Sequence, residues 1–580
     1  GISEPVVQPS EHYTDMGVYS TMIYTKGSLI FRMLRDMVGD EAFLEVLRTY
    51  FRRYAPGHVD QEAFQSVAEE VLRMDLDWFF GQWLHATGVV DYGVEDVETG
   101  EGEAGAFQTE VRIRRHGEMV MPVPVRLWGP EGRHGGQVVD TVLPGSGRIL
   151  SHRISTPWRP EALTLDPEGT ILDWNGLNDH WPRWGFRSPA RDRRLDRPFR
   201  PQVSARDQLL CLLFPLVWYN DAGGAVLGLQ RRGNYMGFMQ RTLVRFGLPA
   251  FEVGDKGGEA ETTDYGSFYF RQENPIVLHE PAFGLSMEGF VGEGRGFLSS
   301  TLRKDLSTRP FSGPRRAVRT FASVATVYDS TYLRPGRWEM VDHTTVEGGL
   351  GASGSVQTRE TSIALDLSGA GGLTTRGHRY VRGSITATLD RDLPRDASLR
   401  LRAFAGAVTG DESGDGEDWG GDHVPLERRF FLAGGGPWET LGNPFFRSAG
   451  APLAERGFVP GGGGVRGVDP SRWVDRVLSL NADLISGSVA LGPLDLRGRA
   501  FGDVAYTPGL ETVKREGDVI SIQEHTLVMD SGVGFDVGWR RSPIRLRVDF
   551  PLVVNDPALA LEKREETLGF RGVISVEGYY

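Results

Sequence analysis

The chain contains 580 residues, with a net charge of −13 and a single cysteine, Cys211. Its length is too great for one domain and favours about three. The negative charge argues against a general nucleic-acid-binding protein, because contacts with phosphates require a basic face. One cysteine excludes an internal disulfide framework and a metal site built from several thiolates.

The longest apolar run, from Leu209 to Tyr219, is too short to cross a bilayer as a helix, which takes roughly 20 residues. If the chain spans a membrane, it therefore does so as a closed β-barrel. The sequence begins with Gly1 and shows no basic segment followed by the apolar stretch of a secretory signal. We expect it to be a fragment whose N-terminal part is missing.

Apolar residues recur at helical spacing from about Thr21 to Gly93, and Gly39 and Pro56-Gly57 mark helix ends. Three apolar faces follow one another in this stretch: Leu29, Ile30, Met33, Leu34 and Met37; Phe43, Val46, Leu47, Tyr50 and Phe51; and Phe64, Val67, Ala68, Val71 and Leu72. This pattern predicts a packed helical unit, and the periodicity itself gives no information about chemistry.

Three short motifs in this unit resemble the aminopeptidase N family of zinc metallopeptidases: Tyr24-Thr25-Lys26-Gly27, Gly39-Asp40-Glu41-Ala42-Phe43 and Trp78-Phe79-Phe80-Gly81-Gln82-Trp83-Leu84. The resemblance covers about the first 95 residues and implies the C-terminal part of the catalytic domain. It assigns to Tyr24 the phenol that stabilises the tetrahedral oxyanion beside zinc, a task suited to a neutral donor aimed at developing negative charge. Without the resemblance, Tyr24 would be interpreted as packing under the helix that follows it.

The zinc-binding motif of that family, H-E-x-x-H, is absent from the chain. His279-Glu280-Pro281-Ala282-Phe283 does not replace it, because the second histidine is missing and proline breaks the helix that would align the ligands. The Gly-x-Met-x-Asn substrate motif of the family is absent too. We therefore expect zinc only in a longer parent protein, with no metal bound by this chain and no activity of the chain alone.

The apolar period changes to two between about Tyr92 and Asn175, which predicts a small β-sandwich over residues 96–177, like the one that follows the catalytic domain in the same family. A carbohydrate-binding sandwich is the alternative, but no aromatic platform supports it. Residues 178–207 form a linker rich in proline and arginine. It is either a solvated tether or a segment that lies against anionic lipid headgroups. Its arginines are Arg183, Arg187, Arg191, Arg193, Arg194, Arg197, Arg200 and Arg206.

Residues 208–580 alternate between apolar and polar almost throughout; Ile544, Leu546, Val548 and Phe550, for example, alternate with Arg545, Arg547 and Asp549. A soluble sandwich shows the same alternation. The number of segments and the charges on one face favour an outer-membrane β-barrel of about sixteen strands, with about eleven before a long glycine-rich loop and five after it. The final pattern, Leu568, Phe570, Ile574, Val576 and Tyr580, resembles the assembly signal of bacterial barrels.

The glycine-rich loop ends in Gly461-Gly462-Gly463-Gly464-Val465-Arg466-Gly467-Val468. With Leu426-Glu427-Arg428-Arg429-Phe430-Phe431-Leu432-Ala433-Gly434-Gly435, it resembles the inward-folded loop of the bacterial surface antigen (BamA-like) barrels, in which an aromatic residue usually stands at the position of Val468. We expect Arg466 to fold into the lumen and meet an inner-wall carboxylate, since a guanidinium suits a bidentate acid. The alternation of apolar and polar residues places two candidate carboxylates, Asp483 and Asp503, on the inner face. The resemblance favours Asp503 as the partner of Arg466. Spacing alone would equally allow a solvated surface loop.

The sequence thus predicts a multidomain protein with a helical metallopeptidase end (1–95), a β-sandwich (96–177), a linker (178–207) and a transmembrane antiparallel barrel (208–580). One functional hypothesis is an outer-membrane-anchored zinc aminopeptidase with its N-terminal domains in the periplasm. It implies peptide substrate, outer-membrane lipid and the barrel assembly machinery as partners. The alternative is an assembly, translocation or transport barrel whose peptidase-like module only binds or docks substrate. A passive pore is a weaker third hypothesis.

Overall fold

The computed structural model describes residues 4–577 with gaps. The residues it does not describe are 1–3, 14–15, 56, 58, 103–104, 131–135, 177, 183–191, 197–207, 221–223, 236–238, 252–265, 274–282, 307–313, 335, 341, 359, 411–423, 448–456, 517–518, 540–544, 556–572 and 578–580. Within the described part of the chain, no helix is both long enough and apolar enough to cross a bilayer.

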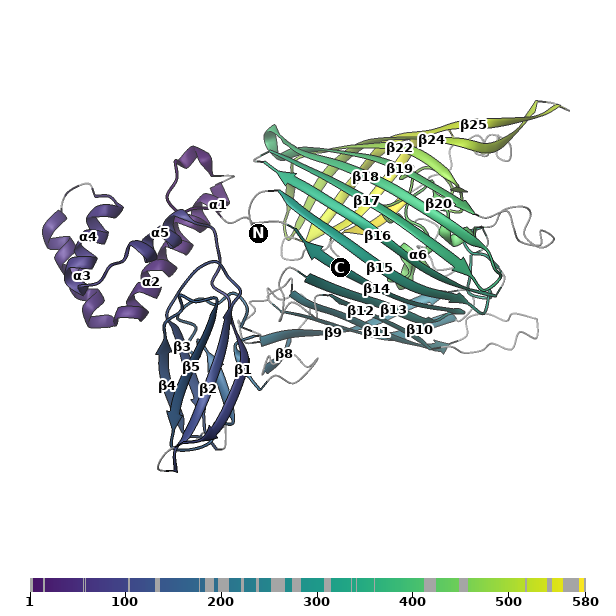
Figure 1. The fold of residues 1–580 in the computed structure, drawn as a ribbon. Coiled ribbons are helices and arrows are strands. Elements are labelled where there is room, and N and C mark those ends of the chain that lie inside the picture. The colour runs from purple at the N-terminus through teal and green to yellow at the C-terminus, as the bar shows by residue number, and fades with distance from the viewer. Residues whose placement is uncertain are drawn as a thin grey trace.

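The N-terminal region is helical, as the spacing of its apolar residues predicts (Figure 1). Gly39, with φ of 87°, separates two of its helices, and the side chain of Asp60 accepts a hydrogen bond from the backbone N–H of Ala63 to cap another. The elements are η1 (Ser10–His12), α1 (Met16–Ser20), η2 (Thr21–Lys26), α2 (Gly27–Val38), α3 (Asp40–Tyr54), α4 (Gln61–Leu72) and α5 (Asp77–His85).

Two small sheets follow and form the predicted sandwich. One has the order β1-β2-β5 and the other β4-β3-β6-β7. Their inner faces and the helices share a single apolar core, in which the indole N–H of Trp83 on α5 lies 3.4 Å from the sulfur of Met121. The strands are β1 (Tyr92–Glu101), β2 (Phe107–Arg115), β3 (Val123–Trp128), β4 (Val138–Leu143), β5 (Ile149–Thr156), β6 (Ala162–Leu165) and β7 (His180–Trp181).

The linker is shorter than the sequence predicts. His180 and Trp181 form β7, which pairs with β6 and so belongs to the sandwich. Residues Asp192–Asp196 form β8, which pairs in parallel with the first long strand of the large sheet. Most of the linker arginines lie outside the described residues, so their position against lipid headgroups stays a prediction.

Apart from the long loop between residues 411 and 475, the described residues after β7 form one large sheet that curls into a barrel, and its strand order returns to its beginning (Figure 1). Apart from β8, which pairs in parallel with β9, eleven described strands precede the long loop, as the sequence predicts. Five described strands of five residues or more follow it, also as predicted, with the three-residue β23 between two of them. Before the loop these are β9 (Gln208–Asn220), β10 (Gly224–Tyr235), β11 (Met239–Phe251), β12 (Ser267–Glu273), β13 (Phe283–Gly292), β14 (Arg295–Asp305), β15 (Arg315–Val327), β16 (His343–Gln357), β17 (Thr361–Thr374), β18 (Arg379–Leu393) and β19 (Ala397–Gly410). After it come β22 (Arg476–Ile485), β23 (Val489–Leu491), β24 (Leu494–Glu516), β25 (Val519–Trp539), β26 (Arg545–Asn555) and β27 (Val573–Glu577).

In this sheet the apolar face is exposed and the charged face is buried, which is the reverse of a soluble sandwich. Leu546 is 44% exposed on the outer face, whereas its neighbour Arg547 is 5% exposed. The same holds on β22, where Leu478 and Leu480 are exposed and Asp483 is buried. An apolar outer face around a charged interior is what a barrel in lipid requires. Of the C-terminal pattern, Ile574 lies in β27, while Leu568, Phe570 and Tyr580 lie outside the described residues.

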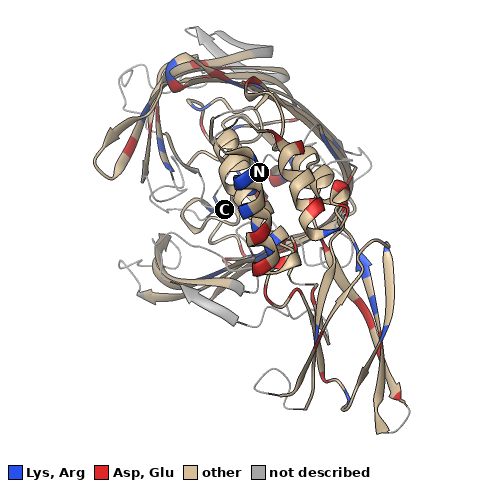
Figure 2. Cartoon of the chain, turned by 90° about the vertical axis from the view of Figure 1, so that its left-hand side faces the viewer, with Lys and Arg blue, Asp and Glu red and all other residues tan. Residues whose placement is uncertain are grey.

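The helical region lies beyond one end of the barrel (Figure 1) and in front of its opening when viewed from that side (Figure 2). Strand β9 begins at this end, because the sandwich and its linker lead into it. The backbone N–H of Gly176, just after the sandwich core, donates to the hydroxyl of Tyr235 at the end of β10. Since neighbouring strands are antiparallel, the turn after β10 is also at this end.

Candidate functional site

Tyr24 lies in η2, a π-helical turn between α1 and α2. Its side chain is 68% exposed, so the structure gives it no packing role under the following helix. Nearby, the ammonium of Lys26 donates to the backbone carbonyl of Ala86 at 3.3 Å, and partial burial lowers the pKa of Lys26. The phenol of Tyr24 is therefore available to a ligand, and its role beside zinc stays a prediction.

One group of potential metal ligands occurs among the described residues: Glu69, Asp75 and Asp77, between α4 and α5. Each carboxylate already accepts a hydrogen bond, that of Asp77 from the side-chain amide of Gln65 at 2.6 Å. Glu69 accepts from the backbone N–H of Leu76 at 3.0 Å, and Asp75 accepts from that of Asp77 at 2.8 Å. The group contains no histidine or cysteine, and two of its members are exposed.

The described parts of the long loop between β19 and β22 lie inside the barrel (Figure 1). They contain η6 (Leu426–Arg428), β20 (Phe430–Phe431), α6 (Pro437–Thr440), α7 (Pro444–Arg447) and β21 (Trp473–Val474). Its glycine-rich end lies against the segment after η6. The backbone N–H of Gly463 donates to the carbonyl of Phe431 at 2.9 Å, and that of Val465 to the carbonyl of Leu432 at 2.8 Å. Gly462 has φ of 44°, and a Cβ there would lie 2.2 Å from the Phe431 oxygen. The contact therefore requires glycine.

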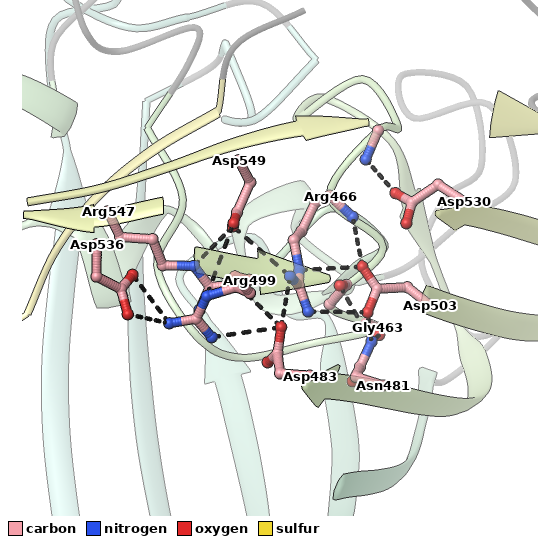
Figure 3. A network of polar contacts seen from close by, with 12 residues as sticks. Gly463, Arg466, Asn481, Asp483, Arg499, Asp503, Asp530, Asp536, Arg547 and Asp549 are labelled. Carbon is pink, nitrogen blue, oxygen red and sulfur yellow. Dashed lines mark hydrogen bonds and ion pairs between the residues drawn. The ribbon is translucent and has the colours of Figure 1, made fainter. Parts of the chain in front are cut away.

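Arg466 lies inside the barrel and reaches both carboxylates that strand alternation offers (Figure 3). Its guanidinium donates to Asp483 at 2.8 Å and to Asp503 at 3.1 Å, while Asp549 lies 3.6 Å away. The guanidinium also lies 4.1 Å from the ring centre of Phe501, a favourable cation–π distance. Arg466 and both partners are buried, so water screens this ion pair little.

Two neighbours of Arg466 hold the loop backbone itself. The backbone N–H of Gly467 donates to the carboxylate of Asp530 on β25. The side-chain amide of Asn481 donates to the carbonyls of Gly463 and Gly464 at 3.2 and 3.1 Å. The loop tip is thus fixed to the wall through both its guanidinium and its main chain.

The ionic network continues along the wall beyond the loop. Arg499 on β24 meets Asp536 on β25 at 2.7 Å, and Arg547 meets Asp549 on β26 at 2.6 Å. Both guanidiniums also lie 3.4 Å from Asp483, which links them to the loop (Figure 3). Arg499, Asp536 and the role of Arg547 were not predicted, although the alternation of polar residues places each on the inner face.

A second set of buried ion pairs holds the middle of the loop to the opposite strands. Glu293, in the turn between β13 and β14, accepts from Arg447 of α7 and from Arg295, each at 2.8 Å. Glu427 of η6 meets the ring of His343 on β16 at 2.6 Å. The contacts of Arg447 and His343 could not be predicted from the sequence, because partners separated by more than 80 residues carry no local pattern.

Residues 1–83 match the model of the peptidase family M1 domain. The chain is 34% identical over 89 residues to aminopeptidase N of Caulobacter vibrioides, covering 15% of this chain and 10% of that protein. It is 30% identical over 79 residues to aminopeptidase N of Lactococcus lactis, covering 14% and 9%. The chain therefore spans about a tenth of the length of these curated relatives.

Among solved structures, BamA of Haemophilus ducreyi lacking POTRA domains 1–3 aligns with 88% of this chain and 94% of its own, at 10% identity and a TM-score of 0.33. Because this score is low, the barrel rests on the strand pairings described above. The M1 match implies zinc. Glu69, Asp75 and Asp77 do not fit that ion, since zinc in peptidases is held by histidine and carboxylate together.

Proposed function

We propose that this protein is a zinc aminopeptidase anchored in the outer membrane, with the helical region as part of its peptidase module and the barrel as its anchor. The observation that carries the proposal is the presence, in one chain, of an M1-matching segment and of a barrel with an apolar outer face. Peptides are the proposed substrates, outer-membrane lipid surrounds the barrel, and the barrel assembly machinery inserts it.

The N-terminal domains are proposed to lie in the periplasm. An even number of long strands returns the end of a barrel to the side on which it began. The helices and sandwich both lie beyond the end where β9 begins. The zinc ligands are proposed to belong to a longer parent protein, because H-E-x-x-H is absent from this chain. Tyr24 is proposed to face the zinc-bound reaction centre.

The filled lumen supports an anchor more than a passive pore. The described parts of the long loop occupy the barrel and are held by buried ion pairs on two sides of the wall. Breaking one partner of such a pair leaves a buried charge, which costs about 3 to 5 kcal/mol. Thermal motion alone will therefore rarely release the loop.

The proposal is tested by expressing the protein from its complete gene in a bacterium with two membranes. Hydrolysis of aminoacyl anilides is measured in intact and in permeabilised cells, with and without a zinc chelator. We expect activity in the outer-membrane fraction, exposed by permeabilisation, abolished by chelation and restored by zinc. Activity that remains without metal contradicts the proposal. Loss of other outer-membrane barrels on gene deletion, without any hydrolysis, favours the assembly alternative instead.

A further inference from the structure

A hollow of about 290 Å³ lies on the inner wall of the barrel, away from the loop network, across β14 to β18. Its position follows from the strand turns. The connections from β14 to β15, from β16 to β17 and from β18 to β19 are all at the end where β9 begins, because successive strands alternate in direction. The lining residues therefore lie near the end of the barrel where β9 begins, the end beyond which the helical region lies in Figure 1. We call this hollow the wall pocket.

Small side chains on three neighbouring strands create the wall pocket. Ala317 on β15 is directly opposite Ser353 on β16, and Ser355 on β16 is opposite Ala364 on β17. All four belong to the lining. Side chains this short leave space above the sheet where longer neighbours would fill it.

Hydroxyl groups and arginines surround this floor. Thr386 and Thr388 on β18 close one side, and Arg303 on β14 and Arg315 on β15 close the other. The one carboxylate in the lining, Asp366, is already engaged by another arginine.

That arginine is Arg319, whose guanidinium donates to both carboxylate oxygens of Asp366, at 2.6 and 2.8 Å. Gly351 permits this arrangement, because a Cβ there would lie 2.6 Å from the Nε of Arg319. Arg303 and Arg315 take part in no ion pair with a described residue. The pocket therefore holds two positive charges that its own carboxylate does not neutralise.

We propose that the wall pocket binds a phosphate-type oxyanion, either free or carried by a lipid headgroup. Two guanidiniums supply planar pairs of donors for oxygen anions, and the serine and threonine hydroxyls supply further donors around them. The guanidinium and hydroxyl groups named here all lie on the inner face of these strands, so the proposed site belongs to the lumen. This site is separate from the peptidase module and does not depend on its activity.

The test uses the whole chain in nanodiscs of zwitterionic lipid, with inorganic phosphate as the probe and calorimetry as the measurement. We expect saturable binding that is roughly tenfold or more weaker in the double variant Arg303→Gln/Arg315→Gln, since two charge-assisted contacts are lost. Lys304→Gln is the matched control. It removes a positive charge one residue from Arg303, but its ammonium lies on the other face, over the ring of Phe283 at 5.1 Å.

Ser355→Phe fills the floor while it keeps every charge, so it separates a shaped site from simple attraction of anions to the lumen. We expect it to abolish binding too. Unchanged binding in Ser355→Phe, or equal losses in the double variant and in Lys304→Gln, overturns the proposal. Adding anionic phospholipid to the nanodiscs distinguishes the two sources. If headgroups occupy the pocket, phosphate binding weakens in the native chain but not further in the double variant.

Discussion

Tyr24 is the residue at which the peptidase hypothesis is most directly testable. In the complete protein, Tyr24→Phe should lower kcat by roughly a hundredfold or more with little change in KM, because an oxyanion donor acts mainly in the transition state. Its 68% exposure means that removing the hydroxyl disturbs no core packing. Steady-state kinetics on an aminoacyl anilide provide the measurement, with Tyr19→Phe as the neighbouring control. An unchanged kcat would show that Tyr24 has no catalytic role.

Arg466 allows a comparison between a buried and an exposed ion pair in the same barrel. Arg466→Ala leaves Asp503 buried without its ion-pair partner and removes one of the three guanidiniums around Asp483, which should destabilise the barrel by about 3 to 5 kcal/mol. The control is Arg400→Ala, whose pair with Asp390 has both side chains 46% exposed and should contribute about 1 kcal/mol or less. Thermal unfolding in detergent, followed by heat-dependent gel mobility, measures both. Equal effects would contradict the structural difference.

The buried carboxyl of Asp91, which immediately precedes β1, should make the stability of the sandwich depend on pH. Burial raises the pKa of Asp91 to about 6, and burial also raises the pKa of the neighbouring Asp173 well above its usual range. A carboxyl whose pKa is higher in the folded state binds protons on folding. The stability it contributes is therefore fully present below about pH 4 and is lost as the pH rises through about 6, a change on the order of 3 kcal/mol.

Asp91→Asn should abolish that loss and strengthen the sandwich at pH 7, since an amide oxygen can still accept the 2.8 Å hydrogen bond from Asn178. Hydrogen exchange of peptides covering β1, corrected for intrinsic rates and compared at pH 5 and pH 7.5, measures the change. Asp140→Asn is the control. A hydrogen bond from Arg126 lowers the pKa of Asp140, so the stability that this carboxylate contributes is lost as the pH falls rather than as it rises. Greater protection of the native chain at the higher pH would contradict the prediction.

At the scale of a single strand, β26 shows how one position separates lipid from lumen. Leu546→Arg places a charge on the apolar outer face and should destabilise the barrel, by about 2 to 4 kcal/mol at the bilayer midplane and by less toward the end of the strand, where Leu546 lies. Leu546→Met, which keeps volume and polarity, should cost far less. Refolding yield and urea unfolding in lipid vesicles provide the measurement. A soluble, well-folded monomer of the arginine variant would disprove the barrel assignment.

The same strand shows why some of the architecture could be predicted and some could not. Alternation of Leu546 with Arg547 is a local pattern, so strand type, inner face and the eleven-plus-five division were readable from sequence. The candidates for Arg466 followed from the same rule. The pairing of β7 with the sandwich could not be predicted, because a strand of two residues shows no apolar period. The ion pair between Glu293 and Arg447 could not be predicted either, because it depends on how a loop without apolar periodicity packs.

At the scale of the whole molecule, the loop and the wall together decide whether the barrel conducts. The loop is fixed at its tip by Arg466 and near its middle by Arg447, which meets Glu293 at 2.8 Å with both side chains buried. These two anchors lie on different parts of the wall, β22 to β26 and the turn between β13 and β14. Releasing one should leave the loop held by the other.

We therefore expect the intact chain to show little ion conductance in planar bilayers and Arg466→Ala/Arg447→Ala to show a marked increase, with each single variant in between. The matched control is Arg391→Ala/Arg400→Ala, which removes two arginines that are more exposed and that lie on the strands β18 and β19 rather than on the loop. Because buried pairs in a low-dielectric interior are screened little by salt, the low conductance should persist at high ionic strength. Steady, high conductance of the intact chain would instead show that the loop leaves an open path, and would favour the pore hypothesis over the anchor.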